Sequence, residues 1–490
     1  MAVKYVAADT TPLYEAPAGK ATLLELLWGD HVIVVDDSGP RVKVRARGKL
    51  GYVDSGAIGD QSLLELYFID VGQGDGVLIR TPDDRHVLID GGYTRASQPT
   101  GKSAADFVDW KFAKDYGADT IHLDAMIASH NDADHYGGLN DLLDTAQEEE
   151  LDADQIHVDA FYHAGVAWWV NPATGRKWLG PPSADGRFLT QLIGKRPQVL
   201  AALKDDGEPR LQGEWAGFLR KVTTARGADG KPTPIARLSE RDGCVPGFDG
   251  AGGGVAFRVL APVDQQANGQ PAVRRFSSDS KNTNGNSLLL RLDYGRVRVL
   301  LTGDLNAESQ QALLSDYTGR RIEFQCDVAK ACHHGSDDVS YEFLSALRPA
   351  VTIISSGDAE GHDHPRPAVV AASATTGYLA IDRDRIVSPL VYSTELARSI
   401  NLGEPKKVTV TQSGQTSEIT DLRSVVVDAS VTKAGDLRPT RVRRSLADTF
   451  IVAGLIYGLV NVRTDGETIL CATLNEKHNT WQVRKVRSRF

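Results

Sequence analysis

The chain of 490 residues has few cysteines and no long hydrophobic segment. Its four cysteines are widely scattered and form no CxxC pair, which indicates reduced thiols in a cytoplasmic protein rather than a disulfide framework. The longest apolar stretch, residues 451–460, is about half as long as a membrane-spanning helix requires. No apolar segment follows Met1-Ala2-Val3-Lys4, so we expect neither a secretory signal nor a membrane association.

An excess of positive charge is also lacking. The net charge of −9 at pH 7 argues against a protein that coats nucleic acid through bulk electrostatics. It does not exclude a nuclease, because bound cations neutralise the carboxylates of a metal site. Residues 441–490 differ from the rest, with nine Lys and Arg against four Asp and Glu. This basic segment is a candidate docking surface for a polyanion.

Four metal-binding side chains stand within six residues, directly after the apolar run 123–128. They are His130, Asp132, Asp134 and His135, and Gly137-Gly138 follow them. A tight loop at the end of a strand can aim such side chains at metal ions, and the glycines let the backbone turn closely into a helix. A solvated acidic loop is the alternative, but it has no need of two flanking histidines. The pattern predicts a metal site.

Further polar residues stand where apolar strands end, and they are possible partners of this loop. Phe68-Ile69-Asp70-Val71-Gly72-Gln73-Gly74-Asp75-Gly76 lies upstream, followed by a strand that ends in Leu88-Ile89-Asp90-Gly91-Gly92. Downstream lie Leu300-Leu301-Thr302-Gly303-Asp304, His333-His334-Gly335-Ser336 and His362-Asp363-His364. Alternating strands and helices between these segments indicate a layered α/β protein.

Together these segments resemble the metallo-β-lactamase superfamily, and specifically the hydrolase domain of the DNA-uptake protein ComEC. The resemblance covers about residues 62–370 and rests on five phrases in the family's order: FIDVGQGDG, LIDGG, SHNDADHYGG, LLTGD and HHGS. It implies an αββα sandwich with a site for two divalent metal ions. ComEC also has a membrane channel, which is not found here, so a transport role is not implied.

The resemblance assigns roles to the site residues. His130 and Asp132 are expected to hold one metal ion, and Asp134 and His135 the other. Asp304 matches the bridging carboxylate, whose two oxygens can each bind one ion. Asp90 matches a residue that orients the ligand loop rather than binding metal.

One histidine of the HHGS segment is expected to complete the ligand set. Strand alternation places Val328, Lys330, Cys332 and His334 on one face and Ala329, Ala331 and His333 on the other. The choice depends on which face is buried. We favour His334 and keep His333 as the alternative.

The chain departs from the commonest pattern of the superfamily at two places. Asp132 replaces a histidine, as it does in the ComEC branch. The stretch before Asp304, residues 282–287, lacks the histidine that the superfamily places there. Oxygen donors make the site harder, so Mn²⁺ competes with Zn²⁺ as the bound ion. His163 is an alternative ligand, although a substrate contact or a structural role is favoured for it.

The favoured function is hydrolysis of a phosphodiester in nucleic acid by a metal-activated water, with Asp134 at the reacting centre. His364, His362 or the unused histidine of the HHGS pair could protonate the leaving oxygen. One alternative substrate is a small phosphodiester such as a cyclic nucleotide or a phosphorylcholine ester. A further alternative is a scaffold protein with a vestigial hydrolase core.

Three domains are predicted. Residues 1–60 carry short strands at the spacing of a small β-barrel and resemble a bacterial SH3-like domain, although the usual Trp before its fourth strand is absent. Residues 62–370 form the hydrolase, with an irregular segment at 171–254 that is either a lid or a surface excursion. Residues 371–490 are expected to form a separate β-rich domain. Both flanking domains could recruit protein partners.

Overall fold

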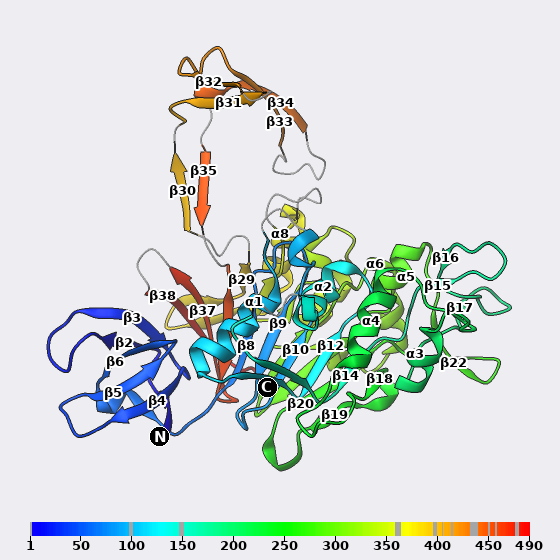
Figure 1. Cartoon of the computed structure of the whole chain (residues 1–490), viewed down its shortest axis with the longest axis horizontal. Coiled ribbons are helices and arrows are strands. Elements are labelled where there is room, and N and C mark those ends of the chain that lie inside the picture. The colour runs from blue at the N-terminus through cyan, green and yellow to red at the C-terminus, as the bar shows by residue number, and fades with distance from the viewer. Residues whose placement is uncertain are drawn as a thin grey trace.

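The computed structural model places most of the chain in one assembly of sheets and helices. The residues that it describes are 2–97, 101–146, 151–357, 364–394, 399–403, 405–412, 415–431, 440–448, 451–455, 458–475 and 480–490. A small N-terminal sheet lies beside a larger core, and a long β-arm projects from one edge of that core (Figure 1).

The N-terminal part is a seven-stranded antiparallel sheet with its own small core. The strand order is β3-β2-β6-β5-β4-β1-β7. The bounds are β1 Val3–Val6, β2 Thr10–Tyr14, β3 Thr22–Leu27, β4 His31–Asp36, β5 Val42–Ala46, β6 Lys49–Val53 and β7 Ile58–Gly59. Leu13, Leu26 and Val44 are fully buried at its centre. A β-rich N-terminal part is therefore confirmed, and the resemblance to an SH3-like domain stays a prediction.

Buried ionic contacts fix this sheet to the core. Arg463 Nη2 lies 2.7 Å from Asp30 Oδ1, and both side chains are almost fully buried. Arg80, which is also buried, donates to the Tyr5 hydroxyl at 3.1 Å. Because a buried charge without its partner is costly, the Arg463–Asp30 pair holds the two parts in one orientation, and the Arg80–Tyr5 hydrogen bond adds a second contact between them.

The first core sheet has nine strands in the order β18-β14-β12-β10-β9-β8-β36-β37-β38. The bounds are β8 Leu64–Phe68, β9 Val77–Arg80, β10 His86–Ile89, β12 Ala125–Ala128, β14 Phe161–His163, β18 Ile235–Arg237, β36 Val460–Thr464, β37 Thr468–Asn475 and β38 Thr480–Arg487. Strands β10, β12, β14 and β18 run parallel. Their residues are almost continuously apolar because both faces of the sheet are covered.

The second core sheet has seven strands in the order β19-β20-β23-β24-β25-β26-β29. The bounds are β19 Cys244–Asp249, β20 Ala256–Ala261, β23 Leu289–Tyr294, β24 Val297–Leu301, β25 Val328–Lys330, β26 Val351–Ile354 and β29 Leu390–Ser393. Leu66 and Ile127 of the first sheet share one buried cluster with Leu290 and Val299 of the second. The main core therefore lies between the two sheets.

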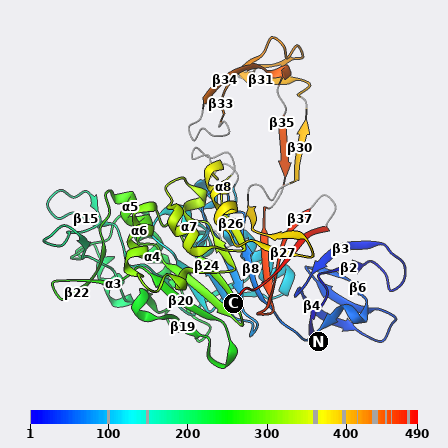
Figure 2. The same cartoon turned by 180° about the vertical axis from the view of Figure 1, so that it is seen from behind.

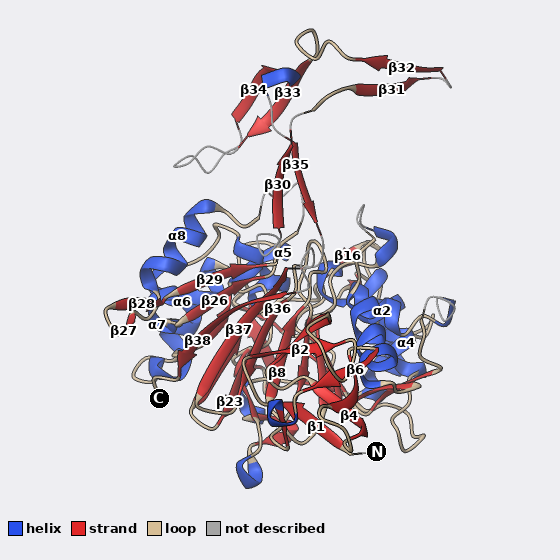
Figure 3. Cartoon of the chain, turned by 90° about the vertical axis from the view of Figure 1, so that its left-hand side faces the viewer, coloured by secondary structure: helices blue, strands red, loops and turns tan. Residues whose placement is uncertain are grey.

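Helices cover the outer face of each sheet (Figures 2 and 3). The helices against the first sheet are α1 Ala104–Asp109, which continues as a π-helix at Trp110–Tyr116, α2 Ala133–Leu142 and α4 Glu214–Thr224. Those against the second are α6 Ala307–Asp316, α7 Tyr341–Leu347 and α8 Pro367–Thr376. Ser103, Asn306 and Ser340 cap α1, α6 and α7 through their side-chain oxygens. The predicted αββα sandwich is thus confirmed.

The segment 171–254 is only partly a surface excursion. Helix α4 lies in the helical layer, and β18 and β19 extend the two core sheets. The smaller elements of the core, within this segment and outside it, are β11 Thr120–Leu123, β13 Gln155–Val158, β15 Trp169–Val170, β16 Lys177–Trp178, β17 Phe188–Leu189, β21 Gln265–Ala267, β22 Gln270–Arg274, α3 Arg196–Ala202 and α5 Asp279–Gly285. Residues 215–222 are helical as part of α4. Residues 189–193 are not helical, and Leu189 ends β17, which pairs with β22.

Residues 371–490 do not form a separate domain. Strand β29 belongs to the second sheet, and β36 pairs with β8 in the first, followed by β37 and β38. Between them lies the arm, with β30 Ser399–Gly403, β31 Val408–Gln412, β32 Gln415–Ile419, β33 Val426–Val431, β34 Thr440–Ser445 and β35 Ile451–Leu455. A short hairpin precedes β29, with β27 Ala380–Asp382 and β28 Arg385–Ser388. The predicted boundary missed this because a local pattern does not show which distant strand a hairpin pairs with.

Candidate metal centre

The candidate site lies at the edge of the core where parallel strands of both sheets end. Strand β12 leads into the loop with His130 to His135, β10 into Asp90, β24 into Asp304, and β25 into the turn with His334. Carboxyl ends of parallel strands meet at one edge of a sheet, so polar residues that follow them gather there. In the residues that the structure describes, one group of four side chains could hold a metal ion: Asp75, His135, Asp304 and His334.

Short distances define this group. Its ligand atoms all lie within 4.8 Å of one another, and all four side chains are buried. Asp304 Oδ2 lies 3.0 Å from His334 Nε2 and 3.3 Å from His135 Nε2. The two Nε2 atoms are 3.3 Å apart. Two ring nitrogens and a carboxylate oxygen thus face a common point, as the ligands of one metal ion would.

The other predicted ligands surround this group. Asp134 Oδ2 lies 3.4 Å from His334 Nε2. The His130 ring centroid lies 4.0 Å from that of His135, and His130 Nε2 lies 3.7 Å from Asp132 Oδ2. The structure therefore brings all six predicted ligands together.

The turn after β25 decides between the two histidines. Residues 332–335 form a short helical turn in which His333 and His334 both have positive φ, 48° and 53°. This backbone is costly for residues other than glycine, and such strain concentrates at functional sites. The His334 side chain is 1% exposed, and its Nε2 lies 3.0 Å from Asp304 Oδ2. The His333 side chain is 25% exposed, and its Nε2 lies 3.9 Å from the same oxygen. The geometry therefore gives the inner position to His334, the favoured residue.

Asp90 orients the ligand loop. Its Oδ2 lies 2.9 Å from His135 Nδ1, and its Oδ1 accepts from the backbone N–H of Ser129 at 2.7 Å. With Nδ1 held, the Nε2 of His135 faces Asp304. Asp90 therefore contacts the ligand His135 and not the point that the ligand atoms of His135, His334 and Asp304 face. This is the geometry predicted for Asp90.

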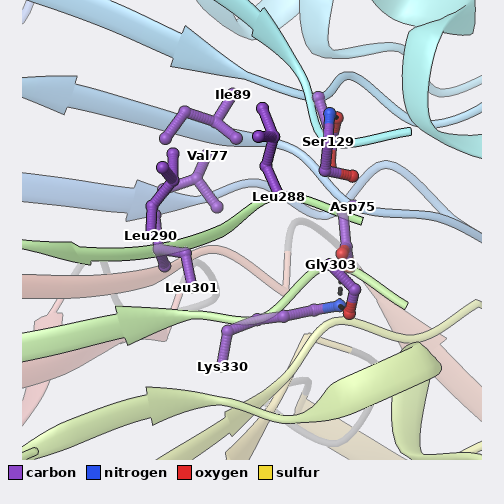
Figure 4. A pocket seen from close by; sticks show the side chains of 10 residues that line it. Asp75, Val77, Ile89, Ser129, Leu288, Leu290, Leu301, Gly303 and Lys330 are labelled. Atoms are coloured by element: carbon purple, nitrogen blue, oxygen red, sulfur yellow. Dashed lines mark hydrogen bonds and ion pairs between the residues drawn. The ribbon is translucent and has the colours of Figure 1, made fainter. Parts of the chain in front are cut away.

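Asp75 and Lys330 were not predicted as site residues. The fully buried Lys330 ammonium contacts Asp75, donates to the Gly303 carbonyl at 3.0 Å and lies 3.6 Å from Asp304 Oδ1 (Figure 4). Asp75 Oδ1 also lies 3.2 Å from His334 Nδ1. Lys330 therefore holds one oxygen of Asp304 while the other faces the histidines. A charged residue inside an apolar strand, as in Val328-Ala329-Lys330, was the available signal.

Oxygen donors stand near the place where the superfamily has another histidine. Thr283 Oγ1 donates to Asp132 Oδ2 at 3.0 Å. The Asn284 amide, with its nitrogen turned toward Asp132, donates to the same oxygen at 2.8 Å. Ser287 Oγ lies 3.3 Å from His130 Nδ1. These hydroxyl and amide groups position the metal loop.

The remaining predicted histidines differ in their distance from the cluster. His163 Nε2 donates to the Gly194 carbonyl at 3.3 Å, and its Nδ1 accepts from Gly165 at 3.1 Å. Burial lowers the pKa of His163 to about 4, so the ring is neutral, and both its nitrogens are used outside the metal group. The His364 ring lies 5.9 Å from that of His333. His362 lies outside the described residues.

The charges of the cluster shift its pKa values in opposite directions. Burial opposes charge on His135 and His334, but Asp304 and nearby carboxylates outweigh it and raise both pKa values well above the usual range. Burial together with the neighbouring His135 lowers the pKa of His130 to about 3. Burial and the Asp134 charge raise the pKa of Asp132 to about 7. Because a metal ion displaces protons from its ligands, binding should release protons.

The donor set fits divalent cations. His130 Nε2 is buried and has no hydrogen-bond partner among the described residues, and Asp132 Oδ2 is close enough for both atoms to reach one ion. Asp304 Oδ1 is likewise buried without a hydrogen bond there. Carboxylates with imidazoles suit zinc, and the high share of oxygen also suits manganese.

These layers and this buried His/Asp cluster are those of a metal-dependent hydrolase of the metallo-β-lactamase class. The family model described as the metallo-beta-lactamase superfamily matches residues 69–357, more than half of the chain, and the protein belongs to that superfamily.

Three curated relatives are competence or recombination proteins. ComE operon protein 3 of Bacillus subtilis (strain 168) is 26% identical over 317 residues, which cover 62% of this chain and 30% of that protein. Competence protein ComA of Neisseria gonorrhoeae is 37% identical over 95 residues, 19% of this chain and 13% of that protein. Recombination protein 2 of Haemophilus influenzae is 32% identical over 115 residues, 23% and 12% of the two chains. The chain thus matches less than a third of the length of each relative.

The basic residues at the end of β38, Arg484 to Arg489, do not lie at the metal centre. Strand β38 runs away from the site edge, and its end pairs Arg487 with Thr468 beyond the far end of β36. The Arg489 backbone donates to Asp327, which precedes β25, at 3.1 Å. Lys485 forms an ion pair with Asp9 of the N-terminal sheet at 2.6 Å. The expected capture of substrate by these residues is therefore not supported. In the described part of the chain, no helix is both long and apolar enough to cross a membrane.

Proposed function

We propose that the protein hydrolyses phosphodiester bonds with two divalent metal ions, Zn²⁺ or Mn²⁺, and that its substrate is nucleic acid. The proposal rests on one observation above all: carboxylates and imidazoles from both sheets converge, buried, at one edge of the core. The competence and recombination proteins among its relatives support a nucleic-acid substrate.

Charge balance supports two ions rather than one. Five carboxylates lie in or against the cluster: Asp75, Asp90, Asp132, Asp134 and Asp304. Lys330 is the one ammonium group beside them in the described site. Two divalent ions together with Lys330 would balance five negative charges, whereas one ion would leave a buried excess that is costly. This count requires a neutral His135 and His334, as metal ligands are.

Each group can be given a task. His130 and Asp132 would hold one ion, Asp134 and His135 the other, and Asp304 and His334 would complete the set. Bound divalent ions supply a water of lowered pKa that can act as a nucleophile near neutral pH.

The protein's own side chains would orient the site and move a proton. Lys330 and Asp90 keep Asp304 and His135 in position. His333 and His364 lie next to each other on the more exposed side of the cluster, where either ring could protonate the leaving oxygen.

A small phosphodiester remains the second candidate substrate. The net charge of −9 and the position of the basic end of β38 at the far end of the sheet both favour it. A small substrate needs no extended cationic surface, since the metal ions alone can bind one phosphate.

The test is an assay of purified protein on single-stranded DNA, RNA and a cyclic nucleotide, after chelator treatment and re-addition of Mn²⁺ or Zn²⁺. We expect metal-dependent cleavage of at least one polynucleotide. The Asp134→Ala variant should be inactive on every substrate, which excludes a contaminating nuclease. Cleavage of the cyclic nucleotide alone would favour the second candidate. No metal-dependent cleavage of any phosphodiester would reject the proposed function.

A further inference from the structure

Two segments that pair with each other through β17 and β22 are rich in exposed cations. Residues 164–200 and 265–278 contain seven Lys and Arg and one Asp, in a chain whose net charge is −9. The segments meet where β17 pairs with β22 (Phe188 with Arg274). Strands β15, β16, β17 and β22 gather at the end of the molecule opposite the N-terminal sheet (Figure 1).

Both segments are connected to the metal loop through described contacts. Strand β14 pairs with β12 (His163 with Ala128), and the His163 ring donates to the Gly194 carbonyl. On the other side, β22 leads into α5, whose Thr283 donates to Asp132. Lys195 directly follows Gly194, and Phe276, directly after Arg275, donates through its backbone N–H to Asn282 Oδ1 beside Thr283.

Three of the seven cations are used within the fold. Arg187 pairs with Asp185, Arg274 pairs with Asp316, and Arg196 donates to two backbone carbonyls. The other four are exposed, and no carboxylate among the described residues lies within ion-pair distance of them: Arg176, Lys177, Lys195 and Arg275. Arg275 also donates to the Gly186 carbonyl, at 3.4 Å. We call these four the basic face.

An aromatic side chain accompanies the basic face. Lys177 Nζ lies 3.9 Å from the centroid of the Trp168 ring, which is partly exposed and also packs against a buried cluster that includes Leu179 and Val273. Cations that follow a phosphate backbone, combined with an aromatic ring on which a base can stack, are typical of proteins that bind single-stranded nucleic acid.

We propose that the basic face binds the backbone of a single nucleic-acid strand and guides it to the metal centre. The inference rests on the proposed function and narrows its substrate to a polynucleotide. A small phosphodiester would have no use for four cations spread over two segments. Outside this face and the basic residues 441–490, acidic residues outnumber basic ones, so most of the remaining surface repels a polyanion.

The experiment compares two variants with the same change of charge. In the first, Arg176, Lys177, Lys195 and Arg275 are all changed to Gln. In the control, four exposed cations elsewhere are changed to Gln: Lys20, Lys49, Arg484 and Arg487. Affinity for a fluorescent single strand of about 20 thymidylates, longer than one typical site, is measured by anisotropy with chelator present, so that cleavage does not interfere.

We expect the first variant to bind at least tenfold more weakly at 0.1 M salt, and the control within twofold of the original protein. The slope of log affinity against log salt should fall by up to about 3, because each lost contact to a single strand removes about 0.7. With metal added, KM for the strand should rise while kcat/KM for bis(p-nitrophenyl) phosphate stays unchanged.

Equal losses in both variants would show an effect of overall charge and overturn the inference, as would unchanged binding and salt slope in the first variant. Since binding is measured without metal, the face can be tested even if no phosphodiester is cleaved. Circular dichroism checks folding, and the paired variants Arg176→Gln/Lys177→Gln and Lys195→Gln/Arg275→Gln give a smaller change should the fourfold variant be unstable.

Discussion

Replacing Lys330 by Met should destabilise the protein and weaken its metal site. The ammonium is 2% exposed and faces Asp75, the Gly303 carbonyl and Asp304. Methionine keeps the length of the side chain but removes the ammonium group from two buried carboxylates, Asp75 and Asp304. Removal of one partner of a buried ion pair costs about 3–5 kcal/mol. At roughly 2 °C per kcal/mol for a domain of this size, the melting temperature should fall by about 6–10 °C.

The measurement is urea denaturation of chelator-treated protein, with metal affinity determined separately. Because Asp304 loses the contact that orients it, metal affinity should fall about 10–100-fold. The double variant Asp75→Asn/Lys330→Met removes both charges and should recover about 2 kcal/mol relative to the sum of the single changes. A loss below about 1 kcal/mol with unchanged metal affinity would refute the assigned role of Lys330.

Four further predictions concern the metal centre and the junction with the N-terminal sheet. Asp134→Ala should lower metal content and abolish activity while the circular dichroism spectrum stays unchanged; full occupancy by elemental analysis would contradict its role as a ligand. Mn²⁺ should restore activity to chelator-treated protein at least as well as Zn²⁺, because the donors are rich in oxygen; restoration by Zn²⁺ alone would argue for another nitrogen ligand. The raised pKa values of His135 and His334 stabilise the chelator-treated protein fully below about pH 6.5, and this contribution is lost as the pH rises through the raised values. Its melting temperature should therefore be lower at pH 9 than at pH 7, with a smaller difference after metal is added. Arg463→Met leaves Asp30 buried without its cation and should cost about 3 kcal/mol in urea denaturation; a change below measurement error would mean that the N-terminal sheet is not held by this pair.

The main layers and most of the cluster could be predicted from the sequence. Because ligand residues follow apolar strands, the order of the motifs predicted the fold. It also predicted that the residues from His130 to His135 lie close to Asp304. Strand alternation was not the physical reason that His334 rather than His333 takes the inner position. Strand β25 ends before these two residues, and a strained turn determines the orientation of both rings. The alternation of a strand does not predict such a turn.

Long-range contacts were beyond what local patterns carry. Asp75 belongs to the site through its contact with Lys330, which lies 255 positions later in the chain and comes from the other sheet. In the same way, the pairing of the hairpin of β36 and β37 with β8 could not be predicted from the residues of the hairpin. The segment 171–254 was irregular in pattern because its elements are short and are shared among several layers.

The pairing of β36 with β8 also has a consequence for how the protein reaches its folded state. Arg463 of β36 contacts Tyr67 of β8 across 396 positions of sequence. During synthesis β8 leaves the ribosome early and has no partner on this side until almost the whole chain has followed. Contacts between such distant segments slow folding, and an unpaired apolar strand is prone to aggregate. The protein should therefore depend on chaperones during synthesis, and fragments that end before β36 should be insoluble.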